Sequence, residues 1–194
     1  MAISETEMNF EREYLSSVTD ELRNKISEIG SNLYQQEEKV NEFKKYLWDS
    51  KAGMDKVEIS SSILENDLEV ELLTLRGHYL KKLMKCENNP YFGRVDFNGD
   101  KIYIGITYLD KNNEHLIYDW RSPISNLFYD AKVGDASYLA PSGIIRGTVT
   151  KRRQYKIENK KLIRVFDSDT NVVDEALQEV LDKESSDKMK NIVN

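Results

Sequence analysis

The fold is decided by the stretch Leu22-Arg23-Asn24-Lys25-Ile26-Ser27-Glu28-Ile29-Gly30-Ser31-Asn32-Leu33. Its apolar residues are spaced alternately by four and three, and the same spacing continues to Leu47. Counting back in sevens gives Leu15 and Met8. A heptad pattern of this length is typical of a coiled coil rather than of a globular helix. The capping box Ser4-Glu5-Thr6-Glu7 predicts where this helix starts.

A second apolar series predicts a second helix, which ends near Cys86; its members are Leu64, Leu68, Leu72, Leu75, Tyr79 and Leu83. Between the two series, Gly53 suits a helix end or a turn. Either Asp55 with Glu58 or Ser62 with Glu65 can cap the second helix. Because each helix must bury its apolar stripe, the sequence predicts an antiparallel coiled-coil arm over residues 4–88 with its tip near residues 48–58. A parallel dimer of the whole arm is the alternative.

The predicted tip carries five candidate partner-binding residues: Trp48, Asp49, Met54, Asp55 and Glu58. Carboxylates on a projecting tip can pair with Arg or Lys of a partner, or approach a metal that a partner holds. The structural alternative is that these acids cap the second helix and stabilise its first turn. Trp48 would then close the end of the coiled coil.

From Pro90 onward the apolar period changes from about 3.5 to 2, which indicates strands. The expected strands are Tyr91–Phe97, Ile102–Tyr108, Glu114–Trp120, Leu127–Tyr129, Ile144–Thr150, Gln154–Glu158 and Leu162–Phe166. Asn98-Gly99 between the first two predicts a hairpin turn. The predicted class is therefore α+β: the coiled-coil hairpin, then a small antiparallel β domain over residues 90–194, barrel- or sandwich-like, with a C-terminal helix from about Val172.

Charge and cysteine content narrow the class of protein. The chain has 194 residues and a net charge of −6. Residues 1–89 hold 12 basic and 18 acidic side chains, so the whole excess of acid belongs to the arm. An acidic arm favours a basic partner surface. A single cysteine, no secretory leader and no long apolar run predict a soluble cytoplasmic protein without membrane contact. The intramolecular hairpin predicts a monomer.

No motif in the chain predicts catalysis. His78 and His115 lack neighbours at zinc-binding spacing, and no phosphate-binding loop or nucleophile motif is present. A metal-dependent nuclease built on the tip acids would lack a pocket that excludes water. Asp119-Trp120-Arg121 fits a structural corner in which Arg121 pairs with Asp119 or with backbone carbonyls. We therefore expect no catalytic residue, metal or cofactor in this chain.

One basic cluster is a candidate contact for nucleic acid or protein: Lys151, Arg152, Arg153 and Lys156. Such a cluster can bind phosphates. Because neighbours on a strand point to opposite faces, a solvated strand or a protein contact is the alternative.

Four strings together resemble the N-terminal region of HelD, the helicase-IV-like motors that associate with RNA polymerase in Gram-positive bacteria. They are Pro90-Tyr91-Phe92-Gly93-Arg94-Val95-Asp96-Phe97, Ile102-Tyr103-Ile104-Gly105, Tyr118-Asp119-Trp120-Arg121-Ser122-Pro123-Ile124-Ser125 and Lys151-Arg152-Arg153-Gln154-Tyr155. The long coiled coil before them fits the same family.

The resemblance implies a DNA-helicase-like, ATP-hydrolysing motor of superfamily 1, of which this chain is an N-terminal fragment without the motor. Met189-Lys190-Asn191-Ile192-Val193 matches the string that precedes the motor in the family. In the family, the coiled coil enters the secondary channel of core RNA polymerase, and the parent, with ATP and Mg²⁺, releases DNA or RNA and recycles polymerase. Family tips carry several acids, whereas Ser50 and Lys56 interrupt the acids of this tip. The competing hypothesis is a coiled-coil module for oligomerisation or tethering, with no polymerase role.

Overall fold

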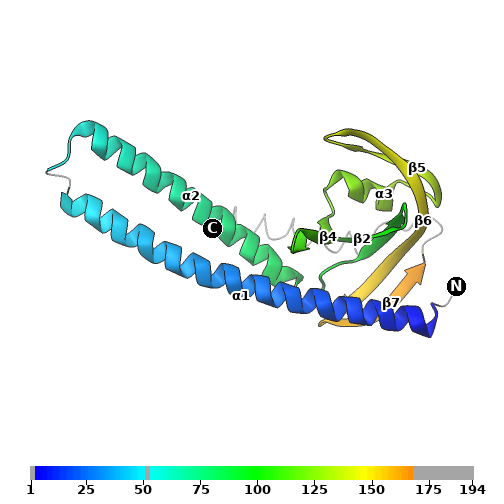
Figure 1. Cartoon of the computed structure of the whole chain (residues 1–194). Coiled ribbons are helices and arrows are strands. Elements are labelled where there is room, and N and C mark those ends of the chain that lie inside the picture. The colour runs from blue at the N-terminus through cyan, green and yellow to red at the C-terminus, as the bar shows by residue number, and fades with distance from the viewer. Residues whose placement is uncertain (1–2, 51–52, 168–194) are drawn as a thin grey trace, which may run out of the picture. The chain divides into compact units, whose positions relative to one another are not determined.

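The computed structural model describes residues 3–50 and 53–167, in two compact units. The sheet unit contains residues 3–21 and 85–167, and the hairpin unit is Leu22–Met84. Helix α1 (Glu5–Ser50) contributes to both units, and helix α2 (Lys56–Cys86) forms the other half of the hairpin (Figure 1). The C-terminal helix expected from about Val172 lies outside the described residues.

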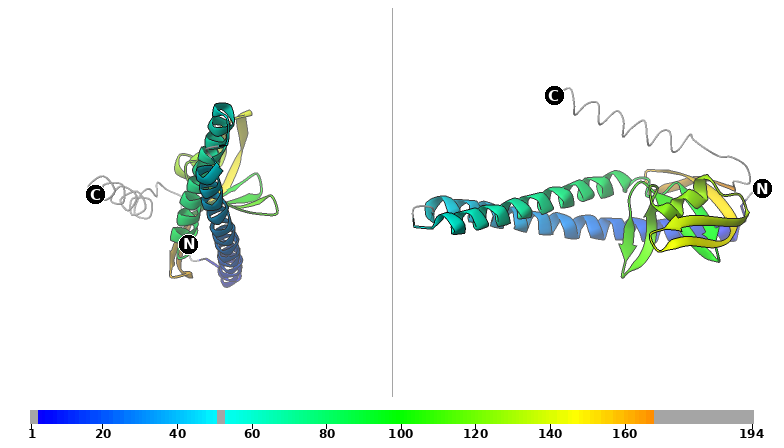
Figure 2. Two further views of the ribbon diagram at one scale, coloured as in Figure 1. Left: turned by 90° about the vertical axis from the view of Figure 1, so that its left-hand side faces the viewer. Right: turned by 90° about the horizontal axis from the view of Figure 1, so that it is seen from above.

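Within the hairpin unit, α1 and α2 lie side by side and run in opposite directions, as both Figure 1 and Figure 2 show. The predicted antiparallel hairpin is therefore confirmed. On α1, the residues at heptad spacing are the ones turned away from solvent: Leu22, Ile26, Ile29, Leu33, Gln36, Val40, Phe43 and Leu47. Gln36, the one polar member, accepts a hydrogen bond from the Arg76 guanidinium of α2.

The predicted apolar series of α2 is not the face that packs on α1. Of this series, Leu64, Leu68, Leu72 and Leu75 are exposed, whereas Tyr79 is half-buried and Leu83 is buried. A different row of the helix has reduced exposure along its whole length: Ile59, Ser62, Asn66, Val70, Leu73, Gly77 and Leu80. The seam of the hairpin thus pairs the apolar α1 stripe with smaller and partly polar α2 residues. Helix α2 has two stripes at helical spacing. The spacing alone predicted that the more leucine-rich stripe packs on α1.

A side chain caps the first turn of each helix. The Glu7 backbone N–H donates to Ser4 Oγ at 3.2 Å, which confirms the predicted start of α1. At α2, Asp55 Oδ1 accepts from the backbone N–H of Glu58 at 2.9 Å, and Glu58 Oε2 accepts from the Asp55 N–H at 3.2 Å. The reciprocal pair at Asp55 and Glu58, rather than the one at Ser62, therefore starts the second helix.

Seven strands form one sheet in the order β3-β4-β2-β1-β6-β5, with β7 also paired to β6. Their bounds are β1 Gly93–Phe97, β2 Asp100–Gly105, β3 Leu109–Lys111, β4 Glu114–Asp119, β5 Gly134–Ala140, β6 Gly143–Glu158 and β7 Lys161–Asp167. All pairs are antiparallel except β2 with β4, which are parallel. The α+β class is confirmed, but the sheet is mixed rather than wholly antiparallel.

Several predicted strands differ from the observed ones. Leu127–Tyr129 belongs to a short helix, α3 (Asn126–Tyr129), which follows a 3-10 turn at Pro123–Ser125. The two strands expected between Ile144 and Glu158 are one long strand, β6, which curves through the sheet in Figure 1. No pattern in the sequence predicted β3 or β5. The β1–β2 hairpin is confirmed, with positive φ at both Asn98 and Gly99.

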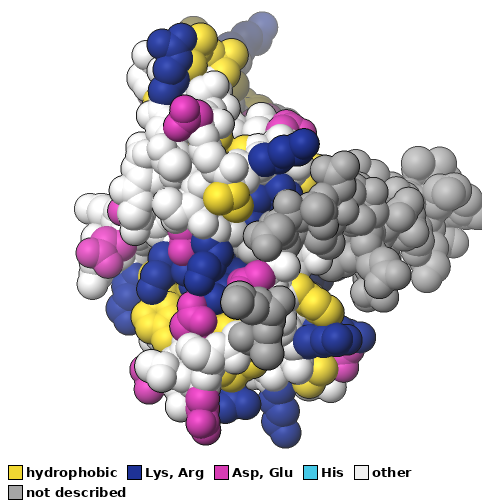
Figure 3. Space-filling model, turned by 90° about the vertical axis from the view of Figure 1, so that its right-hand side faces the viewer, with side chains coloured by type: hydrophobic (Ala, Val, Ile, Leu, Met, Phe, Trp, Pro, Cys, Tyr) yellow, Lys and Arg dark blue, Asp and Glu magenta, His cyan; other side chains and the backbone are white. Residues whose placement is uncertain are grey.

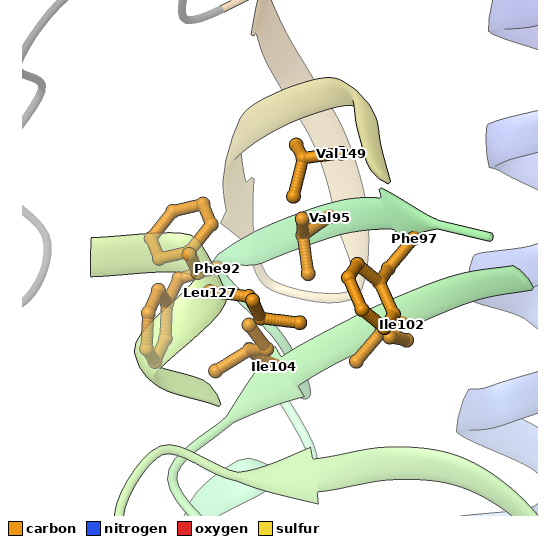
Figure 4. Packing of buried hydrophobic residues seen from close by; sticks show 8 residues of the cluster. Phe92, Val95, Phe97, Ile102, Ile104, Leu127 and Val149 are labelled. Atoms are coloured by element: carbon orange, nitrogen blue, oxygen red, sulfur yellow. The ribbon is translucent and has the colours of Figure 1, made fainter. Parts of the chain in front are cut away.

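One face of the sheet buries the hydrophobic core (Figure 4). Alternate residues of β1 and β2 point into it, and α3 covers it with Leu127 and Phe128. The buried members are Phe92, Val95, Phe97, Ile102, Ile104, Leu127, Phe128 and Val149. A Cβ on Gly93 would lie 2.7 Å from the Phe128 ring, so this strand position has room only for glycine.

The first turns of α1 cover the opposite face of the same sheet. Tyr14 stacks on Tyr103 of β2 with ring centroids 3.9 Å apart, and its hydroxyl donates to the Leu116 carbonyl at 2.6 Å. Leu15 and Val18 are buried in this unit. Leu15 and Met8 therefore belong to the sheet unit and not to the coiled coil, although they continue its heptad pattern.

Candidate functional site

The hairpin tip gathers the five predicted partner-binding residues into one short segment. Helix α1 ends at Ser50, whose carbonyl accepts a hydrogen bond from the Gly53 N–H at 3.0 Å. Trp48, two residues before the helix end, has 79% of its surface exposed. Asp49 is exposed and Met54 is half-buried. The tip therefore presents a large aromatic side chain beside an acid, a combination that suits contact with a partner.

Two of the tip carboxylates already serve the helix. Asp55 Oδ1 accepts hydrogen bonds from the N–H groups of Val57, at 2.8 Å, and of Glu58. Both carboxylates of the capping box remain exposed, so each keeps one oxygen that the cap does not use. No group of three or more His, Cys, Asp or Glu side chains that could hold a metal ion occurs among residues 3–50 and 53–167.

In the sheet unit, a buried ion network fixes the start of α1 on the sheet. The Glu11 carboxylate is fully buried and accepts from Arg94 of β1, from Arg153 Nη1 of β6 at 3.2 Å and from the Tyr103 hydroxyl at 3.0 Å. A buried charge is tolerated only when it is paired and hydrogen-bonded, as it is here. The network therefore joins the start of α1 to β1, β2 and β6 of the sheet.

A second layer of acids completes the network. Arg94 also donates to Asp96, at 2.5 and 2.6 Å, and Arg153 donates to Asp167 at 2.7 Å and to Glu7 at 2.8 Å. Hydrogen bonds from Lys151 and Arg153 lower the pKa of the Glu7 carboxyl from 4.5 to about 2. Burial opposes the charged form of Arg153, but its hydrogen bonds to Asp167 and Glu7 raise its pKa above the ordinary value.

Sequence reasoning missed this network. Glu11 pairs with residues 83 and 142 positions away, and no local pattern encodes such a partner. The available signal was a carboxylate one helical turn before Leu15, at the border of the apolar stripe.

The basic cluster is divided between the two faces of the sheet, as strand alternation predicts. Arg152 is buried and donates to the carbonyls of Ala131, at 2.6 Å, and of Phe128, at 2.5 Å, on the α3 side. Arg153 is buried on the α1 side, in the ion network. Lys151 bonds Glu7 at 3.0 Å, and Lys156 bonds Glu158 at 3.2 Å.

The two arginines of this cluster are therefore buried and have structural roles. The two lysines are the cations of the cluster that remain at the surface. On the face of the molecule in Figure 3, basic and acidic side chains are interspersed rather than separated by sign. A nucleic-acid or protein contact at this cluster stays a prediction, and the surface residues that would make it are Lys151 and Lys156.

Asp119-Trp120-Arg121 forms a corner after β4. Asp119 Oδ1 accepts from the Arg121 backbone N–H at 2.9 Å and from its Nε at 3.0 Å, and Oδ2 accepts from Nη2 at 2.8 Å. The Asp119 carbonyl accepts from Ser125 Oγ at 2.8 Å, which ties the corner to the 3-10 turn. Trp120 packs against the hydrophobic core. These contacts fit the structural corner that the sequence predicted.

The residues that carry the family resemblance are largely buried parts of this architecture. A Cβ on Gly105 would lie 2.3 Å from the Pro90 carbonyl oxygen, and Gly93 faces the Phe128 ring. Arg94, Tyr103 and Arg153 belong to the ion network. The resemblance therefore reflects the fold of the sheet unit and does not by itself identify a binding site.

The protein-family model described as "DNA helicase IV HelD, N-terminal domain" matches residues 8–184. No curated protein matches the chain. Among the described helices, none is long and apolar enough to cross a membrane.

Proposed function

Because the chain belongs to the family of the DNA helicase IV HelD N-terminal domain, we propose that it is the RNA-polymerase-binding arm of a helicase-like, ATP-dependent motor. In this proposal the helical hairpin enters the secondary channel of core polymerase. The parent protein then uses ATP and Mg²⁺, bound by its motor domains, to release DNA or RNA and to recycle polymerase in the cytoplasm. The chain itself binds and does not catalyse.

The observation that carries the proposal is the family match, which includes both helices of the hairpin unit. The shape of that unit supports it. Helix α2 has 31 residues and is roughly 45 Å long at about 1.5 Å per residue, and the hairpin is only two helices wide. A narrow, capped hairpin with an exposed aromatic residue at its tip suits insertion into a channel of a larger protein.

Substitutions at the hairpin tip test the proposal. Asp55 and Glu58 are excluded from the substitutions, because losing the cap would weaken α2 itself. The tip variant is Trp48→Ala with Asp49→Ala. The control is Tyr34→Ala, which removes an aromatic side chain of similar exposure, 72%, from the same helix away from the tip.

The measurement is the affinity of the fluorescently labelled chain for purified core RNA polymerase, without ATP. We expect the unchanged chain to bind, the tip variant to bind at least tenfold more weakly, and the Tyr34 control to stay within twofold. Equal binding by both variants would move the contact away from the tip. Absence of binding by the unchanged chain at micromolar polymerase would contradict the proposed function.

A further inference from the structure

Four leucines on α2 form an exposed apolar row that the hairpin does not use. Their exposed fractions are 63% for Leu64, 55% for Leu68, 45% for Leu72 and 58% for Leu75. Spacings of four, four and three place them within less than a quarter turn of one another, because each residue advances the helix by about 100°. We call Leu64, Leu68, Leu72 and Leu75 the leucine row.

The leucine row lies on the side of α2 opposite the hairpin seam. The seam centres on Asn66, Leu73 and Gly77, and by the same angular count Asn66 lies about 200° around the helix from Leu64. A two-helix hairpin needs one apolar stripe per helix, and α2 already packs its seam on α1. The leucine row is therefore surplus to the hairpin, while a buried Asn66 occupies the seam.

The edges of the leucine row carry charge of one sign. From Leu64 to Leu75 the helix has four carboxylates and no cation. Glu65 and Glu69 follow one edge of the row, and Asp67 and Glu71 follow the other. All four side chains are exposed. A partner must therefore offer apolar side chains for the leucines and positive charge at both edges.

We propose that the leucine row is a docking surface for an amphipathic helix of a partner protein, whose apolar stripe is flanked by Lys and Arg. A second copy of the chain is a poor occupant, because two rows in contact would place eight carboxylates around one seam. An anionic membrane surface is disfavoured by the same charges. The inference goes beyond the proposed tip contact and does not depend on the identity of the protein that the tip enters.

The probe is a synthetic amphipathic peptide with leucines at the same spacings and lysines along both edges. A matched peptide carries glutamates in place of the lysines. Binding of each labelled peptide to the full 194-residue chain is followed by fluorescence anisotropy. The test variant is Leu68→Gln with Leu72→Gln, since glutamine keeps nearly the helix propensity of leucine. The control is Leu139→Gln with Ile144→Gln, a cross-strand pair of the β5–β6 hairpin that is 69% and 63% exposed.

We expect the unchanged chain to bind the lysine peptide at least tenfold more tightly than the glutamate peptide. The Leu68 and Leu72 variant should lose at least tenfold in affinity, and the control should change by less than twofold. A charge-swap variant, Asp67→Lys with Glu71→Lys, should shift the preference toward the glutamate peptide. This variant leaves every leucine in place, so it separates charge recognition from any change in packing.

Three results would each overturn the inference. They are the absence of binding to the lysine peptide at millimolar concentration, equal binding of the two peptides, and unchanged affinity in the Leu68 and Leu72 variant. A fourth result would be a dimer in sedimentation equilibrium that the Leu68 and Leu72 variant converts to monomer. It would mean that a second copy of the chain covers the leucine row. None of these results depends on whether the chain binds polymerase.

Discussion

At the scale of single residues, the four tyrosines between α1 and the sheet differ in what their hydroxyls bond. Tyr14, Tyr91, Tyr103 and Tyr155 meet ring to ring in the sheet unit. The Tyr103 hydroxyl donates to Glu11, whereas that of Tyr155 is buried and has no hydrogen-bond partner among the described residues. Burial raises the pKa of Tyr155 far above its ordinary value, which keeps this hydroxyl protonated.

This difference predicts opposite results for one chemical change. Tyr103→Phe removes a hydrogen bond to a buried carboxylate and should lower the free energy of unfolding by about 1.5–3 kcal/mol. Tyr155→Phe removes an unsatisfied hydroxyl and should leave that free energy unchanged or raise it by up to about 1 kcal/mol. Urea unfolding at neutral pH measures both. Equal losses in the two variants would mean that Tyr155 has a hydrogen-bond partner in solution, such as a buried water.

The Glu7 carboxyl predicts an acid dependence of stability. Its pKa falls from 4.5 to about 2 on folding, because Lys151 and Arg153 donate to it. Folding therefore favours the ionised form, so the stabilisation is complete above the unfolded pKa. It is lost as the pH falls from about 4.5 to about 2.

The check compares melting temperatures of the unchanged chain and of Glu7→Gln across this pH window. The variant should be less stable near pH 6, and the difference should shrink toward zero by about pH 2. As a control, Glu13→Gln removes an exposed carboxylate from the same helix. A constant difference across the window would show that Glu7 acts through packing rather than through its charge.

At the scale of elements, the predictable features are those with a local signal. The α1 stripe, both capping boxes and the Asn98-Gly99 turn depend on residues within a few positions of one another. Leu127–Tyr129 has no such signal, since a short apolar run fits a strand or a helix equally well, and here Pro123 starts a helical segment before it. Strand β5 was missed because its pairing with β6, rather than its own composition, makes it a strand.

The α2 seam was mispredicted for a related reason. Both apolar stripes of α2 follow the helical period, and the contact with α1 decides which of them is buried.

The candidate functional site could be predicted only in part, because the roles of its residues also depend on neighbours in three dimensions. The tip residues could be listed from the sequence, but the roles of Asp55 and Glu58 in the cap and the burial of Arg152 and Arg153 depend on three-dimensional neighbours.

The α2 seam itself makes an element-scale prediction. Asn66 is 8% exposed, and its Oδ1 has no partner within the described part of the chain. It borders a groove that Val40 and Phe43 of α1 also line. Asn66→Leu should therefore raise the free energy of unfolding of the hairpin unit by about 1–2 kcal/mol.

The readout is the thermal midpoint of the helical circular dichroism signal. Asn41→Leu is the matched control, because Asn41 is an exposed asparagine of α1 and its replacement should leave the midpoint nearly unchanged. A lower midpoint for Asn66→Leu would mean that the amide has a partner or that the seam lacks room for leucine.

At the scale of the whole molecule, the division into a sheet unit and a hairpin unit predicts that each can be weakened separately. Glu11→Gln leaves two buried arginines without their shared charge partner and should destabilise the sheet unit by about 2–4 kcal/mol. Leu33→Ala removes half-buried apolar volume from the hairpin seam and should cost about 1–2 kcal/mol there.

Two signals distinguish the units in one thermal scan. Near-ultraviolet circular dichroism reports the tyrosine cluster of the sheet unit, and far-ultraviolet circular dichroism reports mainly the two long helices. Glu11→Gln should lower the midpoint of the first signal more, and Leu33→Ala that of the second. If either substitution moved both signals together, α1, which continues from one unit into the other, would couple them into one cooperative transition. A partner bound to the hairpin unit would then also change the stability of the sheet unit, because α1 belongs to both.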